Sequence, residues 1–115
     1  MTTRAEIEVE QDGDLVVAQL SGEVDMTNAA YVREELTAAV PNGAIGLVVN
    51  LSGTTYLDSA AIELLFELSR RLARRRQALR LVLPDDSPLR RLLMLTDVES
   101  VAELHSSLAD ARASA

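Results

Sequence analysis

The stretch AIGLVVNLSGTTYLDSAAIELLFELSRRL, residues 44–72, decides the fold. Residues 44–51 are a continuous apolar run, which is typical of a strand covered on both faces of its sheet. Residues 52–57 read as a loop, and a long helix is predicted from Asp58 to about Arg76. The helix prediction rests on apolar residues that recur at i, i+3, i+4 and i+7: Ala61, Leu64, Leu65, Leu68 and Leu72. A buried strand that leads into an amphipathic helix indicates an α/β protein.

Before this stretch, the pattern predicts a β-hairpin and a helix. Residues 6–10 alternate Glu with Ile or Val, as a strand with one wet face does, and residues 15–20 form an apolar strand after a turn at residues 12–13. Helix-capping residue types at 25–28 introduce a helix that ends at the Pro, Asn and Gly of residues 41–43. Its apolar positions are Ala29, Val32, Leu36, Ala39 and Val40.

After the stretch, we predict a strand at 79–83, a helix that starts at Ser87 and Pro88, an extended segment around Val101 and a last helix capped by Ser107. Strands that alternate with helices favour parallel pairing. The fold is therefore expected to be α/β, with a four- to five-stranded mixed, mostly parallel sheet, about four helices, and the first strand antiparallel at the edge. All 115 residues, 1–115, are expected to form one domain.

The composition excludes several classes of function. The net charge of −7 disfavours nucleic acid and anionic membranes, because phosphates must be met by clustered basic residues. All eleven basic residues are Arg, so lysine-based phosphate loops and Schiff bases are excluded. The chain contains no Cys, no apolar run of about 18 residues and no signal-peptide pattern. We expect a cytoplasmic protein with no membrane insertion, no metal and no cofactor.

The sequence offers no catalytic constellation of nucleophile, base and charge stabiliser. The single histidine, His105, falls in a predicted loop near the C-terminus. The carboxylates of Glu23, Asp25 and Asp58 are expected at one end of the sheet, where such acids usually cap helices. A receiver domain in which Asp58 accepts a phosphoryl group would need an acidic pair at the first strand and a lysine, and both are missing. We expect no enzyme activity and no small-molecule substrate.

Two polar features of the long helix have alternative interpretations. Ser59 at its start is either part of a helix cap or a phosphorylation site. The second alternative is favoured by the unpaired N–H groups and the helix dipole, which stabilise negative charge at a helix start. At its far end lie Arg70, Arg71, Arg74, Arg75 and Arg76. These cations either complement the negative end of the dipole or bind an anion or a membrane.

Three segments resemble STAS domains, and among them bacterial anti-sigma-factor antagonists. Residues 20–25, LSGEVD, resemble the L-x-G-x-x-D segment of the family, and residues 48–53, VVNLSG, resemble its third strand and exit. Residues 56–61, YLDSAA, resemble the signature in which an Asp-Ser pair begins the second helix and the serine is phosphorylated. The resemblance covers essentially the whole chain, in register. It implies the STAS fold and makes Ser59 the expected phosphorylation site.

Three residues depart from the family pattern. Asn50 replaces the usual Asp of the third strand, and Ala61 and Glu63 replace frequent glycines after the phosphorylated serine. Alanine suits a helix better than glycine, so the fold does not suffer. The carboxylate and the added methyl group lie beside Ser59, where a kinase would approach.

The resemblance implies a partner switch that regulates transcription. The unphosphorylated protein binds an anti-sigma factor that is also a serine-protein kinase, phosphorylation of Ser59 ends the complex, and a phosphatase resets it. ATP and magnesium belong to the kinase. The alternative is a STAS subunit of a (lipid) ABC transport complex that docks on its ATPase without phosphorylation.

The partner-binding surface is expected around the start of the long helix. The expected contact residues are Glu23, Asp25, Asp58, Ser59, Ala61, Ile62 and Phe66. Ile62 and Phe66 lie one helical turn apart on the flank of the apolar stripe, so they either widen the buried face or form an exposed apolar anchor.

Overall fold

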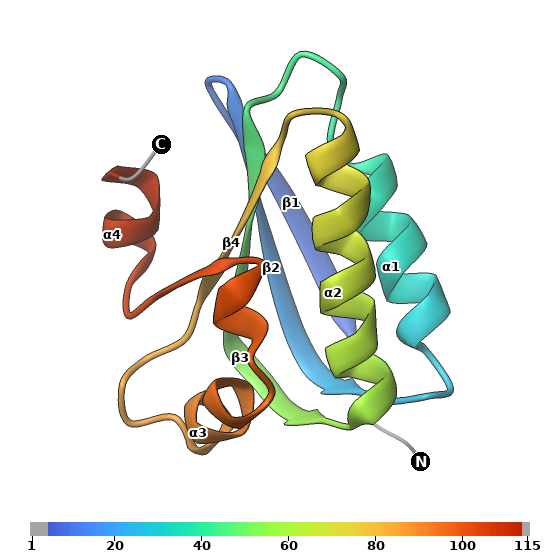
Figure 1. Ribbon diagram of the computed structural model, residues 1–115, viewed down its shortest axis with the longest axis vertical. Helices are drawn as coiled ribbons and strands as arrows, with labels where there is room; N and C mark the ends of the chain where they lie inside the picture. The colour runs from blue at the N-terminus through green and yellow to red at the C-terminus, as the bar shows by residue number, and fades with distance from the viewer. Residues whose placement is uncertain (1–4, 114–115) are drawn as a thin grey trace.

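A computed structural model describes residues 5–113 and shows one five-stranded sheet with helices on both faces (Figure 1). The strand order is β1-β2-β3-β4-β5; β1 pairs antiparallel with β2, and every other neighbouring pair is parallel. The predicted fold class is therefore confirmed. The strands are β1 (Glu6–Asp12), β2 (Leu15–Val24), β3 (Gly46–Leu57), β4 (Ala78–Val82) and β5 (Glu103–His105). The helices are α1 (Ala29–Ala38), α2 (Ser59–Arg74), α3 (Pro88–Leu95), the 3-10 helix η1 (Val98–Ser100) and α4 (Leu108–Ala113).

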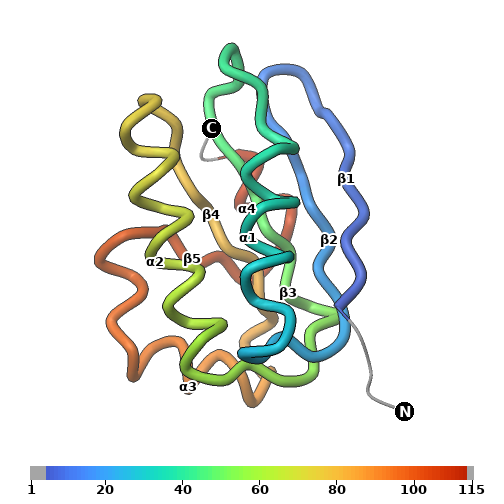
Figure 2. Tube along the Cα trace, turned by 90° about the vertical axis from the view of Figure 1, so that its right-hand side faces the viewer, coloured from blue at the N-terminus to red at the C-terminus, as the bar shows by residue number. Residues whose placement is uncertain are grey.

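Helices α1 and α2 lie side by side on one face of the sheet, as Figure 2 shows from the helix side. The main core forms between these helices and the inward side chains of the strands. The predicted core residues Val48, Leu51, Leu64, Leu68 and Leu81 are all buried. The apolar stripe of α2 is thus confirmed as the face that holds the helix on the sheet.

Helix α4 covers part of the opposite face of the sheet (Figure 1). It closes a second, smaller core formed by Leu15, Val17, Val48, Val82 and Ala111. An ion pair between Arg112 Nε and Asp12 Oδ2, at 3.1 Å, joins α4 to β1. The cap predicted for the last helix is present, because the backbone N–H of Asp110 donates to Ser107 Oγ at 3.1 Å.

The hairpin between β1 and β2 has the two-residue loop Gly13-Asp14, since Asp12 pairs with Leu15. Gly13 has φ +62°, a conformation that favours glycine in tight hairpins. The glutamates of β1 alternate along its outer face, and an edge strand charged in this way resists pairing with other chains.

The structure corrects two loop predictions. Residues 52–57 are part of β3, because β2 also extends to Val24 and the two strands remain paired through two register shifts. The buried hydroxyl of Thr54 donates to the Leu20 carbonyl at 2.7 Å, so a polar residue fits inside this extension. His105 lies on β5 rather than in a loop, paired with Val82. Among residues 5–113, no helix is long and apolar enough to cross a membrane.

Candidate functional site

The ends of β2 and β3 bring two loops and the start of α2 to one edge of the sheet (Figure 1). Val24 pairs with Leu57 at the ends of these parallel strands, and the N–H of Asp58 donates to the Val24 carbonyl at 3.3 Å. Because parallel strands end on the same side, both chains leave the sheet together toward α1 and α2. This edge holds the residues predicted to form the site.

Asp58 joins the two loops at this edge. Its Oδ1 accepts a hydrogen bond from the N–H of Ala61 at 3.0 Å, which makes Asp58 the N-cap of α2. Its Oδ2 accepts from the N–H of Met26 at 3.0 Å, which connects the β2–α1 loop to α2. One carboxylate therefore stabilises the helix start and holds the neighbouring loop against it.

The β2–α1 loop has its own hydrogen-bond network. Asp25 Oδ1 accepts bonds from both the N–H, at 2.9 Å, and the hydroxyl of Thr27. Asn28 accepts from the N–H of Asp25 at 3.0 Å and donates to the Glu23 carbonyl at 2.9 Å. The hydrogen bond from the Thr27 side chain is the main reason why the pKa of Asp25 is lowered. The predicted capping residues thus mainly order the loop, since the Asn28 side chain makes no capping bond to α1.

Ser59 is the first residue of α2, and its side chain is exposed. No residue in the described part of the chain hydrogen-bonds its hydroxyl. The histidine is not beside it: His105 lies on the far edge strand, where its Nε2 is 2.9 Å from Glu103 Oε1. The Ser59 hydroxyl is therefore exposed at the helix start, and its nearest acidic neighbours along the chain are Asp58 and Glu63.

The remaining predicted contact residues differ in exposure. Ile62 and Phe66 are half-buried and pack against the main core, so they widen the buried face and also show part of their surface. Glu23 is partly exposed. Ala61 is 0% exposed, so its side chain belongs to the core under the helix and does not reach the surface. Its expected role as a direct contact is corrected, because the first turn of α2 presses this position onto the sheet.

Sequence reasoning missed two exposed apolar side chains at this edge. Met26 is 80% exposed in the β2–α1 loop, and Tyr56 is 49% exposed near the end of β3. Neither belongs to a periodic apolar pattern. The one signal in the sequence is that Met26, an apolar residue, directly follows Asp25 in a predicted loop, where polar residues are usual.

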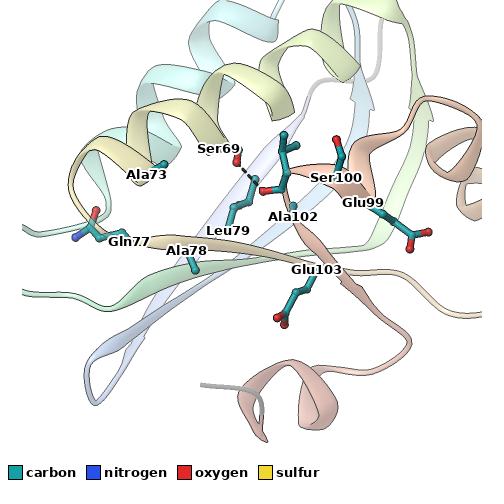
Figure 3. Close-up of a pocket in the computed structure, with 10 residues that line it drawn as sticks. Ser69, Ala73, Gln77, Ala78, Leu79, Glu99, Ser100, Ala102 and Glu103 are labelled. Carbon is teal, nitrogen blue, oxygen red and sulfur yellow. Dashed lines mark hydrogen bonds between the residues drawn. The ribbon is translucent and has the colours of Figure 1, made fainter.

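A groove lies away from this edge. It has a volume of about 350 Å³ and runs between the C-terminal half of α2 and the η1–β5 segment (Figure 3). Ser69 on its wall donates to the Val101 carbonyl at 2.7 Å, which joins α2 to that segment. None of the predicted contact residues lines the groove.

The arginine cluster lies at the other end of α2. Arg71 pairs with Glu34 at 3.2 Å, and Arg75 donates to the Val40 carbonyl and to Asn42 Oδ1, both at 2.8 Å. Arg70, the first arginine of the cluster, lies 11 residues beyond Ser59, which is about 16–17 Å along the helix axis. The two polar features of α2 are therefore independent in space.

The fold and the site together define a small α/β domain with an exposed serine at a capped helix start. Comparison with protein families matches residues 6–111 to the STAS domain, and the chain belongs to this family.

Solved structures agree with this assignment. A crystal structure of an anti-sigma factor antagonist from Mycobacterium paratuberculosis is 25% identical, with a TM-score of 0.84 over 96% of this chain and 93% of that chain. An anti-sigma-factor antagonist (STAS) domain protein from Planctomyces limnophilus is 20% identical, with a TM-score of 0.80 over 96% and 98%. The phosphorylated form of the Bacillus cell fate determinant SpoIIAA is 18% identical, with a TM-score of 0.69 over 95% and 98%. The last two show the fold alone. No curated protein matches the chain.

Proposed function

We propose that this STAS domain, residues 1–115, is a cytoplasmic anti-sigma-factor antagonist that works by partner switching. The unphosphorylated protein binds an anti-sigma factor that is also a serine-protein kinase, and so regulates transcription. Phosphorylation of Ser59 ends the complex, and a phosphatase restores it. The protein itself is not an enzyme; ATP and magnesium are bound by the kinase.

The observation that carries the proposal is the exposed Ser59 hydroxyl at the first position of α2. A helix N-terminus tolerates negative charge because its N–H groups and dipole are positive there. A phosphate adds about −1.5 to −2 charges at neutral pH, so the fold is expected to accept it. SpoIIAA, whose fold this chain shares, has been solved in a phosphorylated form, and this supports phosphorylation as the kind of switch proposed.

Release of the partner follows from the charges around Ser59. Asp58 precedes it and Glu63 lies one turn further along the exposed side of α2. In a docked interface, a phosphate would lose water beside these two carboxylates, and the chain has no lysine to pair with it. A loss of about 3 kcal/mol weakens binding roughly a hundredfold, which is enough to release a partner.

The docking face comprises the surface beside Ser59. Ile62 and Phe66 supply its apolar part through their exposed portions, and Glu23, Asp25 and Asp58 supply its polar rim. Half-buried apolar side chains are pre-ordered by the core, so they lose little freedom when a partner covers them.

The decisive experiment combines mass spectrometry with a binding titration. The protein is incubated with the co-purified kinase and ATP, the phosphate is mapped, and both forms are titrated against that partner. Ser59→Ala should stay folded, resist phosphorylation and bind constitutively, whereas Ser59→Asp should bind poorly. Ser52→Ala removes another exposed serine, on β3, and should behave as the wild type.

Two results would contradict the proposal. The phosphate could map to another residue, or both forms could bind the partner equally well. Either result, together with recovery of a transport ATPase as the partner, would favour the alternative of a STAS subunit in a transport complex.

A further inference from the structure

The C-terminal half of α2 carries a basic hollow of about 200 Å³ that the proposed function does not use. It is lined by Glu67, Arg70, Arg71 and Arg74. Three of these four side chains carry a guanidinium group.

The charges around the hollow do not cancel. Its one carboxylate, Glu67, pairs with Arg33 at 2.9 Å, and Arg71 pairs with Glu34 at 3.2 Å. Arg70 and Arg74 are exposed, and within the described residues no side chain or backbone group pairs with their guanidinium groups. Two uncompensated cations therefore flank one hollow.

Helix-dipole stabilisation accounts for only part of this cluster. Arg71 and Arg74 already place two cations in the last turn of α2, and Arg75 follows as the C-cap. Arg70 and Arg74 are four residues apart on the same side of the helix, where like charges repel each other and destabilise the helix. A bound anion would convert this repulsion into attraction.

We propose that Arg70, Arg71 and Arg74 form a binding site for a small oxyanion of the phosphate class. Guanidinium groups are planar and donate paired N–H bonds, which match the oxygens of a phosphate group. Their side-chain attachments at i and i+4 are about 6 Å apart, so both reach one compact ligand.

A compact anion fits this site better than a membrane surface does. The whole chain carries −7, and the neighbouring α1 presents Glu34 and Glu35 as exposed side chains next to α2. A flat anionic bilayer would meet these carboxylates as well as the arginines. A small ligand seated among Arg70, Arg71 and Arg74 meets one carboxylate, that of Glu67, which already pairs with Arg33.

The test is an NMR titration of the full chain with sodium pyrophosphate, with inorganic phosphate, sulfate and chloride as separate arms at matched ionic strength. Pyrophosphate should give saturable shifts at the Nε–H signals of Arg70, Arg71 and Arg74. It should bind more tightly than inorganic phosphate because it spans two guanidinium groups. The affinity should fall as sodium chloride is added, because these groups are exposed.

The double variant Arg70→Gln/Arg74→Gln should lose at least about tenfold in affinity. The matched control Arg76→Gln/Arg91→Gln removes the same charge from exposed positions outside the hollow and should stay within about twofold of the wild type. Unchanged melting temperatures would show that both variants fold. Because Ser59 is not involved, the Ser59→Asp variant should bind pyrophosphate like the wild type.

An equal loss of pyrophosphate affinity in both double variants would overturn the proposal, because it would indicate nonspecific electrostatic attraction and no defined binding site. The proposal would also be overturned by shifts that never saturate, or by shifts of equal size with chloride. Binding to anionic lipid vesicles without saturable pyrophosphate binding would assign the patch to a membrane instead.

Discussion

The hydrogen bonds of Asp58 lead to a quantitative prediction for the substitution Asp58→Ala. The change removes the acceptor for the N–H of Ala61 and the acceptor for the N–H of Met26, both at 3.0 Å. Loss of a helix N-cap costs about 0.5–2 kcal/mol. A further exposed hydrogen bond adds about 0.5–1.5 kcal/mol. The free energy of unfolding should therefore fall by about 2 kcal/mol.

The assay is thermal and urea unfolding, combined with amide hydrogen exchange read by NMR. For a domain of this size, a loss of 2 kcal/mol should lower the melting temperature by roughly 6–12 °C. The matched variant Asp58→Asn separates the two bonds, because its Oδ1 still accepts from Ala61 while its Nδ2 cannot accept from Met26. Exchange at the Met26 amide should accelerate in both variants, and exchange at the Ala61 amide only in Asp58→Ala. If the Met26 amide exchanges at the wild-type rate in both variants, Asp58 does not hold the β2–α1 loop and the reasoning is refuted.

Three further predictions concern the core, the sheet and the pH dependence. Leu68→Ala removes a fully buried side chain of α2 and should lower the free energy of unfolding by about 2–5 kcal/mol in urea titrations. A smaller loss would mean that the surrounding side chains move in and fill the space that Leu68 leaves. Gly46→Ala would place a Cβ 2.5 Å from a carbonyl oxygen of β4 and should cost about 1–3 kcal/mol, whereas Gly43→Ala, with open space around it, should be nearly neutral. The lowered pKa of Asp25 means that its contribution to stability is present above the ordinary value of 3.8 and is lost as the pH falls through the lowered folded-state pKa. Thr27→Val should shift this pKa back toward 3.8 in a carboxyl NMR titration, and an unchanged pKa would show that the hydroxyl bond is not its cause.

The apolar patterns of the sequence predict the architecture because each strand and helix must pack with its apolar side chains in the core. The structure buries the stripe of α2 and the apolar side chains of the run at 44–51, with the exception of Ile45, which is 45% exposed just before β3 begins. The extension of β3 to Leu57 was not predictable from such patterns. It depends on two register shifts against β2 and on Thr54, whose polar group becomes acceptable inside only through its bond to the Leu20 carbonyl.

The candidate site was predictable where the chemistry is local. A capping Asp before an exposed serine is a property of adjacent residues, and both Asp58 and Ser59 lie where the sequence predicted. The bond from the Met26 N–H to Asp58 spans 32 residues, so no short pattern reveals it. The burial of Ala61, in contrast, follows from its place in the apolar stripe of α2, and this burial conflicts with its expected role as a direct contact.

The second core has a consequence for synthesis of the protein on the ribosome. Its sheet residues, from Leu15 to Val82, are all made before α4, and Ala111 of α4 completes the cluster. Chains grow from the N-terminus at about 5–20 residues per second, so the strands can pair before their outer apolar patch is covered. Until residues 108–113 leave the exit tunnel, the nascent sheet presents that patch to water, and folding intermediates of this kind are the ones that chaperones bind.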